Sequence, residues 1–553
     1  MDNKFLRYFH TLRYLKFCQV YWRIRYKVIQ SRVCTSRRSE LRAKWGNWVN
    51  PACRRSSLER EFSFKFLNEV GELNELGWDG NQRSRLWRYN QHYFDDLNAK
   101  ESESRSRSHH RLIHRWIKEN PPASGTGWEP YPLSLRIVNW VKWQLSGNAI
   151  TGEGLESLFV QARWLFQNIE WHILGNHLFA NAKALVFAGL FYDGSEAQIW
   201  LAKGLKIITT ELSEQVLPDG GNFERSPMYH AIFLEDILDL INLIHCYPGV
   251  VRTELEVQLR ATAKKMLVWL DAMCHPDKEI SFFNDSAIGI APSPCEIQSY
   301  AMRLGILYGK EKQDFKRFSC MHFVESGYIR LSSRNAVVLL DVAPIGPDYL
   351  PGHAHADTLA FEMSLFGVRV IVNGGTSKYG SDVVRLIERG TAAHSTVEIN
   401  GLDSSEVWSG FRVARRAYPM DLKVKEDRDG VSVACSHNGY MRLPGRNIHR
   451  RFWQFFDGRL VVKDEIEGRF ETAVARFHFH PDIQIVAKNQ SSFLLCLPYS
   501  GREIQVIIIS GVASIESSNY APEFGIKLSS RCLSVRFESS RAIAVEFLWS
   551  NND

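Results

Sequence analysis

The stretch GHAHAD, residues 352–357, leads directly into the run TLAFEMSLFG, residues 358–367. The second run alternates polar and apolar side chains, which predicts a half-buried β-strand. Residues two apart in extended backbone point to the same side, so His353 and His355 would project together beside Asp357 where the chain enters a sheet. The stretch predicts either a site at a strand end or a solvated histidine-rich turn.

The residues that follow favour a site. A second apolar run, residues 368–372, ends at NGGT, residues 373–376, and AAHST, residues 392–396, comes shortly afterwards. A third histidine, His394, therefore joins the pair near the ends of predicted strands. Imidazole transfers protons near neutral pH and is the commonest metal ligand. We interpret this cluster as a functional site.

The hydrophobic pattern outside this stretch divides the chain into a helical part and a β-rich part. Residues 155–310 carry apolar side chains at helical spacing in successive segments, which predicts an all-α domain. From about residue 320 onward, short β-rich runs alternate with turn residues, which is typical of an all-β sandwich. We expect the border between Lys310 and Val324.

Length and charge bound the class of protein. The 553 residues exceed a single hydrophobic core, and 45% hydrophobic with 23% charged residues is a globular composition. Residues 1–50 contain twelve Lys or Arg and two acidic residues, so a local charge of +10 accounts for the net +7 and leaves about −3 elsewhere. A nucleic-acid function for the whole chain is therefore not supported. The basic segment either contacts an anionic membrane surface or acidic polymer, or packs on the body as an ordinary helix.

The cysteines and the apolar runs indicate a compartment. Ten cysteines are scattered with no CxxC pair, which indicates reduced thiols and neither a disulfide framework nor a zinc cluster. We find no apolar signal region at the start and no run of about 18 apolar residues. We expect a cytoplasmic protein that is either free or peripheral to the inner membrane.

Two motifs in the helical part carry further chemistry. LGNHLFANAK, residues 174–183, opens an amphipathic helix, and Asn176 is either its N-cap or a site residue. DGGNFERSPMYH, residues 219–230, is a loop that enters the next helix, where Ser226 or Pro227 is a natural starting residue. Tyr229 either covers this helix end or takes part in chemistry.

Four motifs together resemble the heparinase II/III family of polysaccharide lyases. They are GNH at 175–177, ERSPMYH at 224–230, GHAHAD at 352–357 and RGTAAHST at 389–396, in the order and approximate spacing of that family. The resemblance covers roughly residues 60–550. It implies a multidomain α+β fold, with a basic arm at 1–60, an incomplete (α/α) toroid at 61–315 and an antiparallel β-sandwich at 320–553.

The resemblance implies β-elimination at a uronic acid unit of an acidic polysaccharide. The carboxylate beside C5 must first be neutralised or hydrogen-bonded, so that the developing charge is stabilised; this role maps to Asn176, with His177 beside it. A Tyr and a His then act as general base and acid, and they map to Tyr229 and His353. Tyr229 would act as a base only with help from neighbours such as Arg225 or His230, but needs none as an acid.

The resemblance also implies a structural divalent metal, which would be zinc. Its ligand positions map to His355, Asn373 and His394, with Asn373 a poorer, neutral ligand in the third position. The alternative is that the two histidines hydrogen-bond each other or Asp357 and brace the loop. His478 and His480 share one face of a predicted strand, and we interpret that pair as structural.

Several residues are candidates for contact with the glycan. They are Arg225, Glu224, Trp128, Arg136 and His92, with Trp87, Tyr89 and Tyr131 as further aromatic candidates. Arg suits carboxylate or sulfate by bidentate pairing. The alternative for each is a packing role at the rim of the toroid.

Three functions share these residues. The first is a lyase, and the second is a uronate C5-epimerase of polysaccharide biosynthesis, which needs the same first proton transfer. The third is a non-catalytic glycan-binding component of a polysaccharide assembly system. A complete acid–base set is not needed merely to bind, which argues for the first two.

Overall fold

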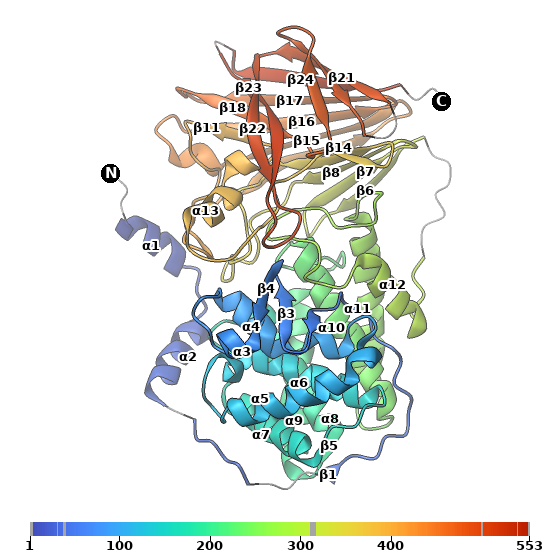
Figure 1. Ribbon diagram of the computed structural model, residues 1–553. Coiled ribbons are helices and arrows are strands. Elements are labelled where there is room, and N and C mark those ends of the chain that lie inside the picture. Colours follow the sequence, from blue (N-terminus) through green and yellow to red (C-terminus); the bar gives the residue numbers. More distant parts are fainter. Residues whose placement is uncertain are drawn as a thin grey trace.

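The computed structural model describes residues 4–29, 31–36, 40–309, 317–498, 501–538 and 540–550. The fold is multidomain α+β, with an N-terminal incomplete α/α toroid and a C-terminal antiparallel β-sandwich stacked on it (Figure 1). This is the fold class that the sequence predicts. Part of the expected border, residues 310–316, lies outside the described residues; the last toroid helix ends at Arg303 and the first sandwich strand begins at Ser319.

The toroid is built from antiparallel helices whose bounds follow the helical periodicity closely. They are α4 (Arg85–Tyr93), α5 (Ser106–Glu119), α6 (Pro130–Leu145), α7 (Gly152–Gln167), α8 (Gly175–Phe191), α9 (Ser195–Gln215), α10 (Pro227–Cys246), α11 (Thr253–Ala272) and α12 (Pro294–Arg303). Helices α8 and α10 are buried on nearly every side because their sequences are apolar all round. They form the centre of the domain and present their N-termini to the sandwich.

The all-α description of residues 61–315 is incomplete at the start of this range. A three-stranded antiparallel sheet of β2 (Leu58–Arg60), β3 (Ser63–Phe66) and β4 (Glu69–Glu72) precedes the helices. Phe64 and Phe66 lie two apart on β3 and stack on each other at 5.3 Å, so one face of this small sheet is apolar. The stretch is too short to show a strand period clearly, which is why the sequence did not predict it.

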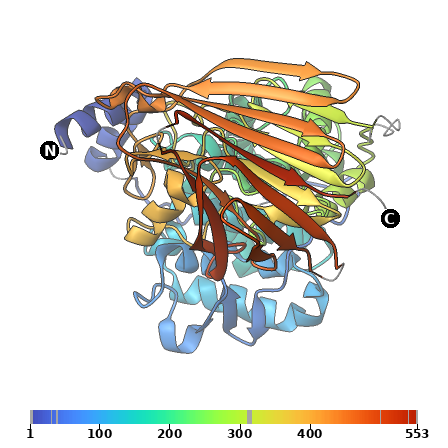
Figure 2. The ribbon, with the colours of Figure 1, turned by 90° about the horizontal axis from the view of Figure 1, so that it is seen from above.

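The sandwich contains three main antiparallel sheets (Figure 2 looks down on its strands). A five-stranded sheet has the order β10-β9-β8-β7-β6, from β10 (Val368–Ile371), β9 (Phe361–Leu365), β8 (Ala336–Asp341), β7 (Tyr328–Ser332) and β6 (Ser319–Phe323). An eight-stranded sheet runs β14 (Pro419–Glu426), β15 (Gly430–His437), β16 (Ile448–Phe456), β17 (Arg459–Glu467), β24 (Ala542–Leu548), β21 (Glu503–Ser510), β20 (Ser492–Cys496) and β19 (Gln484–Ala487). The third sheet has the order β11 (Val397–Ile399), β18 (Ala473–His478), β23 (Leu528–Arg536) and β22 (Val512–Tyr520).

Strand β8 explains how the two domains pack. Its residues are all buried, although antiparallel strands usually have one solvated face. Val338 and Leu340 point into the sandwich core, whereas Val337 and Leu339 pack with Trp269 of α11. Strand β8 is therefore apolar on both faces and joins the toroid to the sandwich.

A loop of the sandwich makes a second connection. Residues 521–527, between β22 and β23, descend to the toroid as the long red loop in Figure 1. The Ile288 backbone N–H donates to Pro522 O at 2.7 Å, and Asn68 Nδ2 donates to Phe524 O at 2.9 Å. Strand β8 and this loop therefore provide two separate contacts between the domains.

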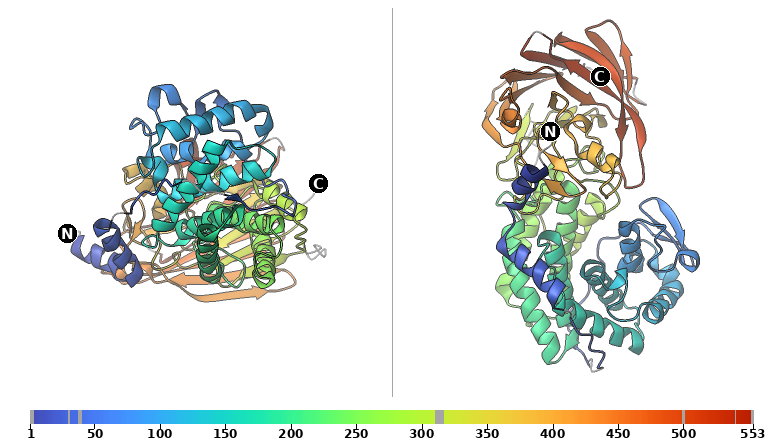
Figure 3. Two further views of the ribbon diagram at one scale, coloured as in Figure 1. Left: turned by 90° about the horizontal axis from the view of Figure 1, so that it is seen from below. Right: turned by 90° about the vertical axis from the view of Figure 1, so that its left-hand side faces the viewer.

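The basic arm forms two helices that touch both domains, α1 (Lys4–Leu12) and α2 (Phe17–Val28) (Figure 3). On the sandwich side, Tyr8 packs edge-on against Trp408 at 5.0 Å. On the toroid side, Trp22 stacks on Trp171 at 6.1 Å. Gln19 is buried and its Nε2 donates to Tyr349 O at 3.4 Å. The arm therefore packs on the body.

Two sequence expectations concern the whole chain. All ten cysteines lie among the described residues and are unpaired, as the lack of CxxC spacing predicts. Across the described ranges, none of the helices combines the length and the apolar character needed to span a lipid bilayer.

Candidate active site

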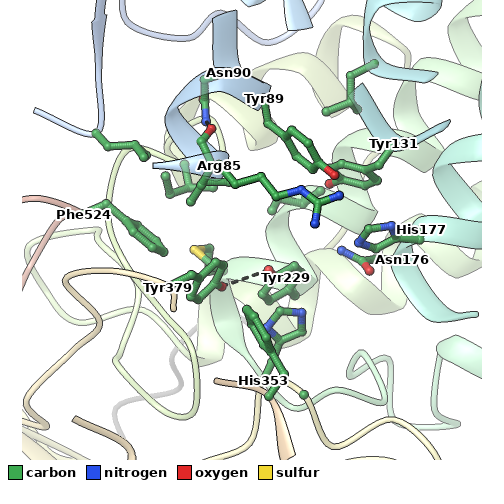
Figure 4. Close-up of a pocket in the computed structure, with 18 of the residues that line it drawn as sticks. Arg85, Tyr89, Asn90, Tyr131, Asn176, His177, Tyr229, His353, Tyr379 and Phe524 are labelled. Carbon is green, nitrogen blue, oxygen red and sulfur yellow. Dashed lines mark hydrogen bonds between the residues drawn. The ribbon is translucent and has the colours of Figure 1, made fainter. Parts of the chain in front are cut away.

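A cleft of about 1790 Å³ lies where toroid, sandwich and arm meet. Its walls come from the N-termini of α8 and α10, from the loop before β9, and from the loop before α13 (Val383–Arg389). Figure 4 shows Asn176 and His177 of α8, Tyr229 of α10 and His353 of the loop before β9 facing this space. The cleft thus brings together all four side chains that the sequence motifs predict to be catalytic.

Asn176 is the second residue of α8, and the helix N-cap is Leu174. The N-cap alternative for Asn176 is therefore wrong. Gly175 adopts a φ of +56°, and a Cβ there would lie 2.2 Å from Leu350, so this tight turn requires glycine. His177 also lines the cleft, where its ring packs on Tyr131 at 4.3 Å and its Nδ1 lies 3.1 Å from Glu170 Oε1.

Tyr229 lies in the first turn of α10. Ser226 caps this helix by accepting the Tyr229 backbone N–H at 3.1 Å, and Pro227 is its first residue, as the sequence suggested. The Tyr229 hydroxyl lies 2.9 Å from the Tyr379 hydroxyl, and its ring packs on His353 at 3.9 Å. Burial, with smaller contributions from Tyr379 and other neighbours, raises the pKa of Tyr229 well above 10. The residue is a neutral proton donor in this setting.

The two side chains expected to help Tyr229 act as a base face elsewhere. The His230 ring stacks on Trp269 at 4.3 Å, and its Nε2 donates to Met266 O at 2.9 Å. Arg225 Nε donates to Ser326 O at 3.0 Å. Neither residue lines the cleft. That expectation is therefore wrong.

His353 is held by a buried carboxylate. Its Nδ1 lies 2.9 Å from Asp285 Oδ2, and its Nε2 lies 3.7 Å from Glu224 Oε2. Burial by itself would raise the pKa of Asp285, but Arg385 and hydrogen bonds from His353 and His355 outweigh it and hold that pKa well below the usual range. An ionised Asp285 keeps the proton on Nδ1 and leaves the lone pair of Nε2 available.

Asp285 is the centre of the site, although no sequence motif predicted it. Its Oδ2 accepts from Arg385 Nη2 at 2.6 Å, Arg385 Nη1 contacts Oδ1, and His355 Nε2 lies 2.8 Å from Oδ1. Asp285 and Arg385 are both fully buried. The only signal was the polar trio Asn-Asp-Ser at 284–286 directly after two phenylalanines, a pattern that also fits an ordinary turn.

His355 and His394 form a second, fully buried group beside Asp357. His355 Nδ1 and His394 Nε2 are 3.3 Å apart, and candidate ligand atoms of the three residues lie within 4.8 Å of one another. Tetrahedral zinc with Zn–N bonds of about 2.0–2.1 Å holds two ring nitrogens about 3.3 Å apart, so the spacing fits. Burial, as the main cause, lowers the pKa of His355 to about 4 and of His394 to about 3, so both rings are neutral, as ligands must be.

Asn373 does not lie where the third ligand was expected. Its Oδ1 is 3.2 Å from His394 Nδ1, on the opposite side of the ring from the nitrogen that faces His355. With this arrangement Nδ1 donates, and the lone pairs of His394 Nε2 and His355 Nδ1 face each other, which favours a cation between them. The geometry replaces Asn373 with Asp357 as the third candidate ligand, and gives Asn373 the role of orienting His394.

The predicted glycan contacts are mostly structural. Trp128, Arg136 and His92 are buried within the toroid and do not line the cleft. Arg136 Nη2 donates to Gly127 O at 2.8 Å, and its guanidinium lies over Trp116 at 3.8 Å. These three residues, and Arg225 as well, therefore have the packing role that was the alternative to glycan contact.

Glu224 and a set of tyrosines surround the reacting groups. Glu224 is buried behind His353, and burial raises its pKa. Of the aromatic candidates, Tyr89 and Tyr131 line the cleft, whereas Trp87 is buried and does not. Tyr379 was not predicted, because it follows a Gly-rich loop in no recognisable motif.

Comparisons with known proteins agree with this architecture. Residues 21–299 match the heparinase II/III N-terminus model, and residues 317–548 match the heparinase II/III-like C-terminal model. The solved structure of heparinase III covers 85% of this chain and 77% of its own, with a TM-score of 0.66 and 18% identity, which is a likeness of fold.

Two relatives show how far sequence similarity extends. The heparin-sulfate lyase of Bacteroides stercoris is 24% identical over 371 residues, 62% of this chain and 52% of its own, so the chain spans about half the length of that relative. FtsZ-localized protein C of Caulobacter vibrioides is 24% identical over 461 residues, 77% of this chain and 76% of its own. Since the two family models together match most of the sequence, this chain belongs to the heparinase II/III family.

Proposed function

We propose that this protein is a lyase that cleaves a uronate-containing acidic polysaccharide by β-elimination. The observation that carries the proposal is the convergence of Asn176, Tyr229 and His353 on one cleft, with His353 hydrogen-bonded to an ionised Asp285. A site that only bound glycan would not need a buried carboxylate behind a cleft-facing imidazole.

The first requirement is to stabilise the substrate carboxylate. The Asn176 side chain lines the cleft, and among the described residues its side-chain amide makes no hydrogen bond, so it is available to donate to a carboxylate there. Its place in the first turn of α8 adds the partial positive charge of a helix N-terminus. His177 beside it supplies a second polar group. Charge that develops on the carboxylate during C5–H removal would then be stabilised.

The second requirement is a base and an acid. His353 Nε2 has an available lone pair, because Asp285 holds the proton on Nδ1, so we assign His353 as the base that removes the C5 proton. Tyr229 keeps its proton because its pKa is raised, so we assign it as the acid that protonates O4 as the C4–O4 bond breaks. Tyr379 shares a hydrogen bond with Tyr229 and orients its hydroxyl.

We further propose that His355, His394 and Asp357 hold a structural zinc ion. Such an ion would supply a rigid crosslink between the loop before β9 and the loop after α13. Its effect on the reaction would be indirect, because His355 also hydrogen-bonds Asp285, which positions His353.

The test measures ultraviolet absorbance on a panel of uronate polymers in deuterated water. Elimination creates a C4=C5 double bond conjugated to the carboxylate, so absorbance should rise with wild-type protein and not with His353→Ala. No rise, but deuterium at C5, would replace the lyase with a C5-epimerase. Neither signal on any polymer would leave a glycan-binding component as the function.

We also propose that the arm contacts an anionic membrane surface. Phe5, Phe17 and Val28 are 81%, 83% and 75% exposed on α1 and α2, and the same segment carries the chain's basic excess. Exposed apolar side chains beside cations suit a bilayer interface with anionic lipid.

Vesicle sedimentation tests the membrane contact. Phe5→Ser with Phe17→Ser should weaken binding to vesicles rich in phosphatidylserine, and binding to neutral vesicles should be weak for both proteins. Val257→Ser with Leu307→Ser removes two other exposed apolar side chains and serves as the control. Equal binding by all three proteins would contradict the contact.

A further inference from the structure

The charged side chains that line the cleft are evenly balanced. Among the described residues, the lining contains ten Lys or Arg and ten Asp or Glu side chains, so its formal charge at neutral pH is zero. Recognition of a strongly anionic polymer normally uses a surface of one sign, which attracts the ligand and raises its local concentration. This cleft has no such excess.

The deepest cations are already neutralised by buried partners. Lys142 Nζ lies 2.9 Å from Asp239, and Lys183 Nζ lies 2.6 Å from Asp236, with both lysine side chains at most 5% exposed. A sulfate group could pair with these lysines only by displacing a carboxylate that would then remain buried without a partner. That exchange is strongly unfavourable.

The cations nearer the opening are paired as well. Arg54 forms a two-pronged ion pair with Glu235 at 2.7 and 2.6 Å, and Arg55 pairs with Glu523 at 2.7 Å. The remaining paired lining cations are Arg85, which contacts Glu129, and Lys378, which contacts Asp382. Six of the ten cations are therefore committed to acidic partners within the described structure.

Four lining cations remain without an acidic partner among the described residues. In the part of the chain that the structure describes, these are Arg23, Lys65, Arg412 and Lys527, and all four are exposed. They come from α2, β3, β13 (Arg412–Val413) and the loop before β23. Asp95 and Glu170 also line the cleft without a Lys or Arg partner, and would repel an additional anion.

The cleft also contains aromatic side chains that can bind a sugar without using charge. Tyr89, Tyr131, Tyr349, Tyr379 and Phe524 line the same space from five separate elements. An aromatic ring offers an apolar face to the C–H groups of a sugar, and a Tyr hydroxyl adds a hydrogen bond at the edge. These contacts depend on the shape of the sugar ring and not on whether the sugar is sulfated.

We infer that the cleft selects a glycan that carries only the carboxylate charge of its uronate units, and discriminates against sulfate esters. This inference rests on the proposed lyase function and names the substrate class within it. Two features together would produce this discrimination: Asn176 and His177 receive one carboxylate, and six of the ten lining cations, including the most deeply buried ones, are already paired with carboxylates and cannot receive a sulfate without breaking those pairs.

Matched polymers test the inference on the full-length wild-type chain. Heparin is compared with its fully desulfated, N-acetylated form, and chondroitin sulfate with desulfated chondroitin, so that each pair shares one backbone. We expect at least a tenfold higher kcat/KM on the unsulfated member of whichever pair is cleaved. Equal or faster cleavage of the sulfated member would overturn the inference and leave the lyase function intact.

Binding separates the inference from the proposed function. If no polymer yields unsaturated product, the lyase proposal fails, and fluorescent hexasaccharides of each matched pair are then titrated at 150 mM chloride. Tighter binding of the unsulfated hexasaccharide supports the inference. Equal or tighter binding of the sulfated one overturns it, whatever the outcome for turnover.

A charge variant adds an independent check. Glu523→Gln removes the partner of Arg55 and should raise the ratio of sulfated to unsulfated kcat/KM, or of the corresponding affinities, severalfold. Asp482→Asn removes the same charge from an exposed residue outside the cleft and should leave the ratio unchanged. An unchanged ratio in both variants would count against an electrostatic origin of the selectivity.

Discussion

Tyr229 is buried against His353 and Tyr379, and this setting decides which protonation state takes part in the reaction. Its ring packs on the imidazole at 3.9 Å, and its hydroxyl lies 2.9 Å from the Tyr379 hydroxyl. Burial disfavours the phenolate, so the proton stays on Tyr229 at any pH at which the protein is used. His353, in contrast, has a carboxylate to hold its other proton.

This division of roles predicts different responses to the leaving group. Tyr229→Phe and His353→Ala should each lower kcat on the natural polymer by about 10²–10⁴-fold. A synthetic uronate with fluoride at C4 needs no protonation of the leaving group, so it should restore much of the rate for Tyr229→Phe and none for His353→Ala. Tyr379→Phe, which removes only the orienting hydroxyl, should show a smaller loss.

The opposite pattern would reverse the assignment. Rescue of His353→Ala by the fluoride substrate, with none for Tyr229→Phe, would make Tyr229 the base. Circular dichroism spectra that match the wild-type spectrum are the control that the variants are folded.

Asp285 is predicted to serve both stability and activity. Asp285→Asn leaves the buried Arg385 guanidinium without a counter-ion, which should lower the free energy of unfolding by about 3–5 kcal/mol. It should also lower kcat, because a neutral amide would replace the ionised carboxylate that holds the Nδ1 proton of His353. Chemical denaturation and initial rates measure the two effects.

A surface ion pair provides the matched control for Asp285. Asp427→Asn breaks a pair with Lys425 in which the two side chains are 54% and 75% exposed, so the cost in stability should be small. Similar unfolding free energies for both variants would contradict the central role of Asp285.

At the scale of elements, two loops of the sandwich depend on the proposed zinc site. His355 belongs to the loop before β9, and His394 to the loop between α13 and β11. If zinc joins them, prolonged chelation should lower the melting temperature by several degrees, and added zinc should restore it, because an ion bound only by the folded state stabilises that state.

Ligand variants locate the third ligand. Asp357→Asn should lower the zinc content measured by mass spectrometry, whereas Asn373→Ala should retain most of it, since Asn373 lies on the far side of the His394 ring. A wild-type protein that binds no zinc after reconstitution would leave a direct hydrogen bond between His355 and His394 as the brace.

At the scale of the whole molecule, buried neutral histidines set the dependence of stability on pH. Burial, as the main cause, lowers the pKa of His230 to about 3 and of His478 to about 4. The same side chains take up protons near pH 6.5 when the chain is unfolded. The unfolded state therefore binds more protons below pH 6.5, and stability falls as pH decreases from about 7 towards 4.

Thermal melts between pH 7.5 and 5 test this dependence. The melting temperature should decrease across the range, and His478→Gln should show a shallower decrease, although its stability at pH 7.5 is lower. His114 has a side chain that is 54% exposed, so His114→Gln should keep the wild-type slope. Parallel curves for all three proteins would contradict the assignment of His478 as a neutral buried group.

The architecture of the whole molecule was largely predictable from the sequence. Helical periodicity between residues 155 and 310 and short β-rich runs beyond 320 are local properties, and the structure has helices and strands at those positions. Three of the four motifs placed Asn176, His177, Tyr229 and His353 in one cleft, because each of these motifs begins or precedes a regular element whose end faces the other domain. These features needed no knowledge of long-range contacts.

The tertiary structure alone decided what each side chain touches. Asp285 lies 68 residues from His353 and 100 residues from Arg385 in the sequence, so no local pattern could predict that these side chains are in contact. Arg225 and Arg136 have the right chemistry for glycan binding, yet packing turns their guanidinium groups towards backbone carbonyls. Period and propensity act over a few residues, whereas the partner, burial and pKa of a side chain depend on segments that only folding brings together.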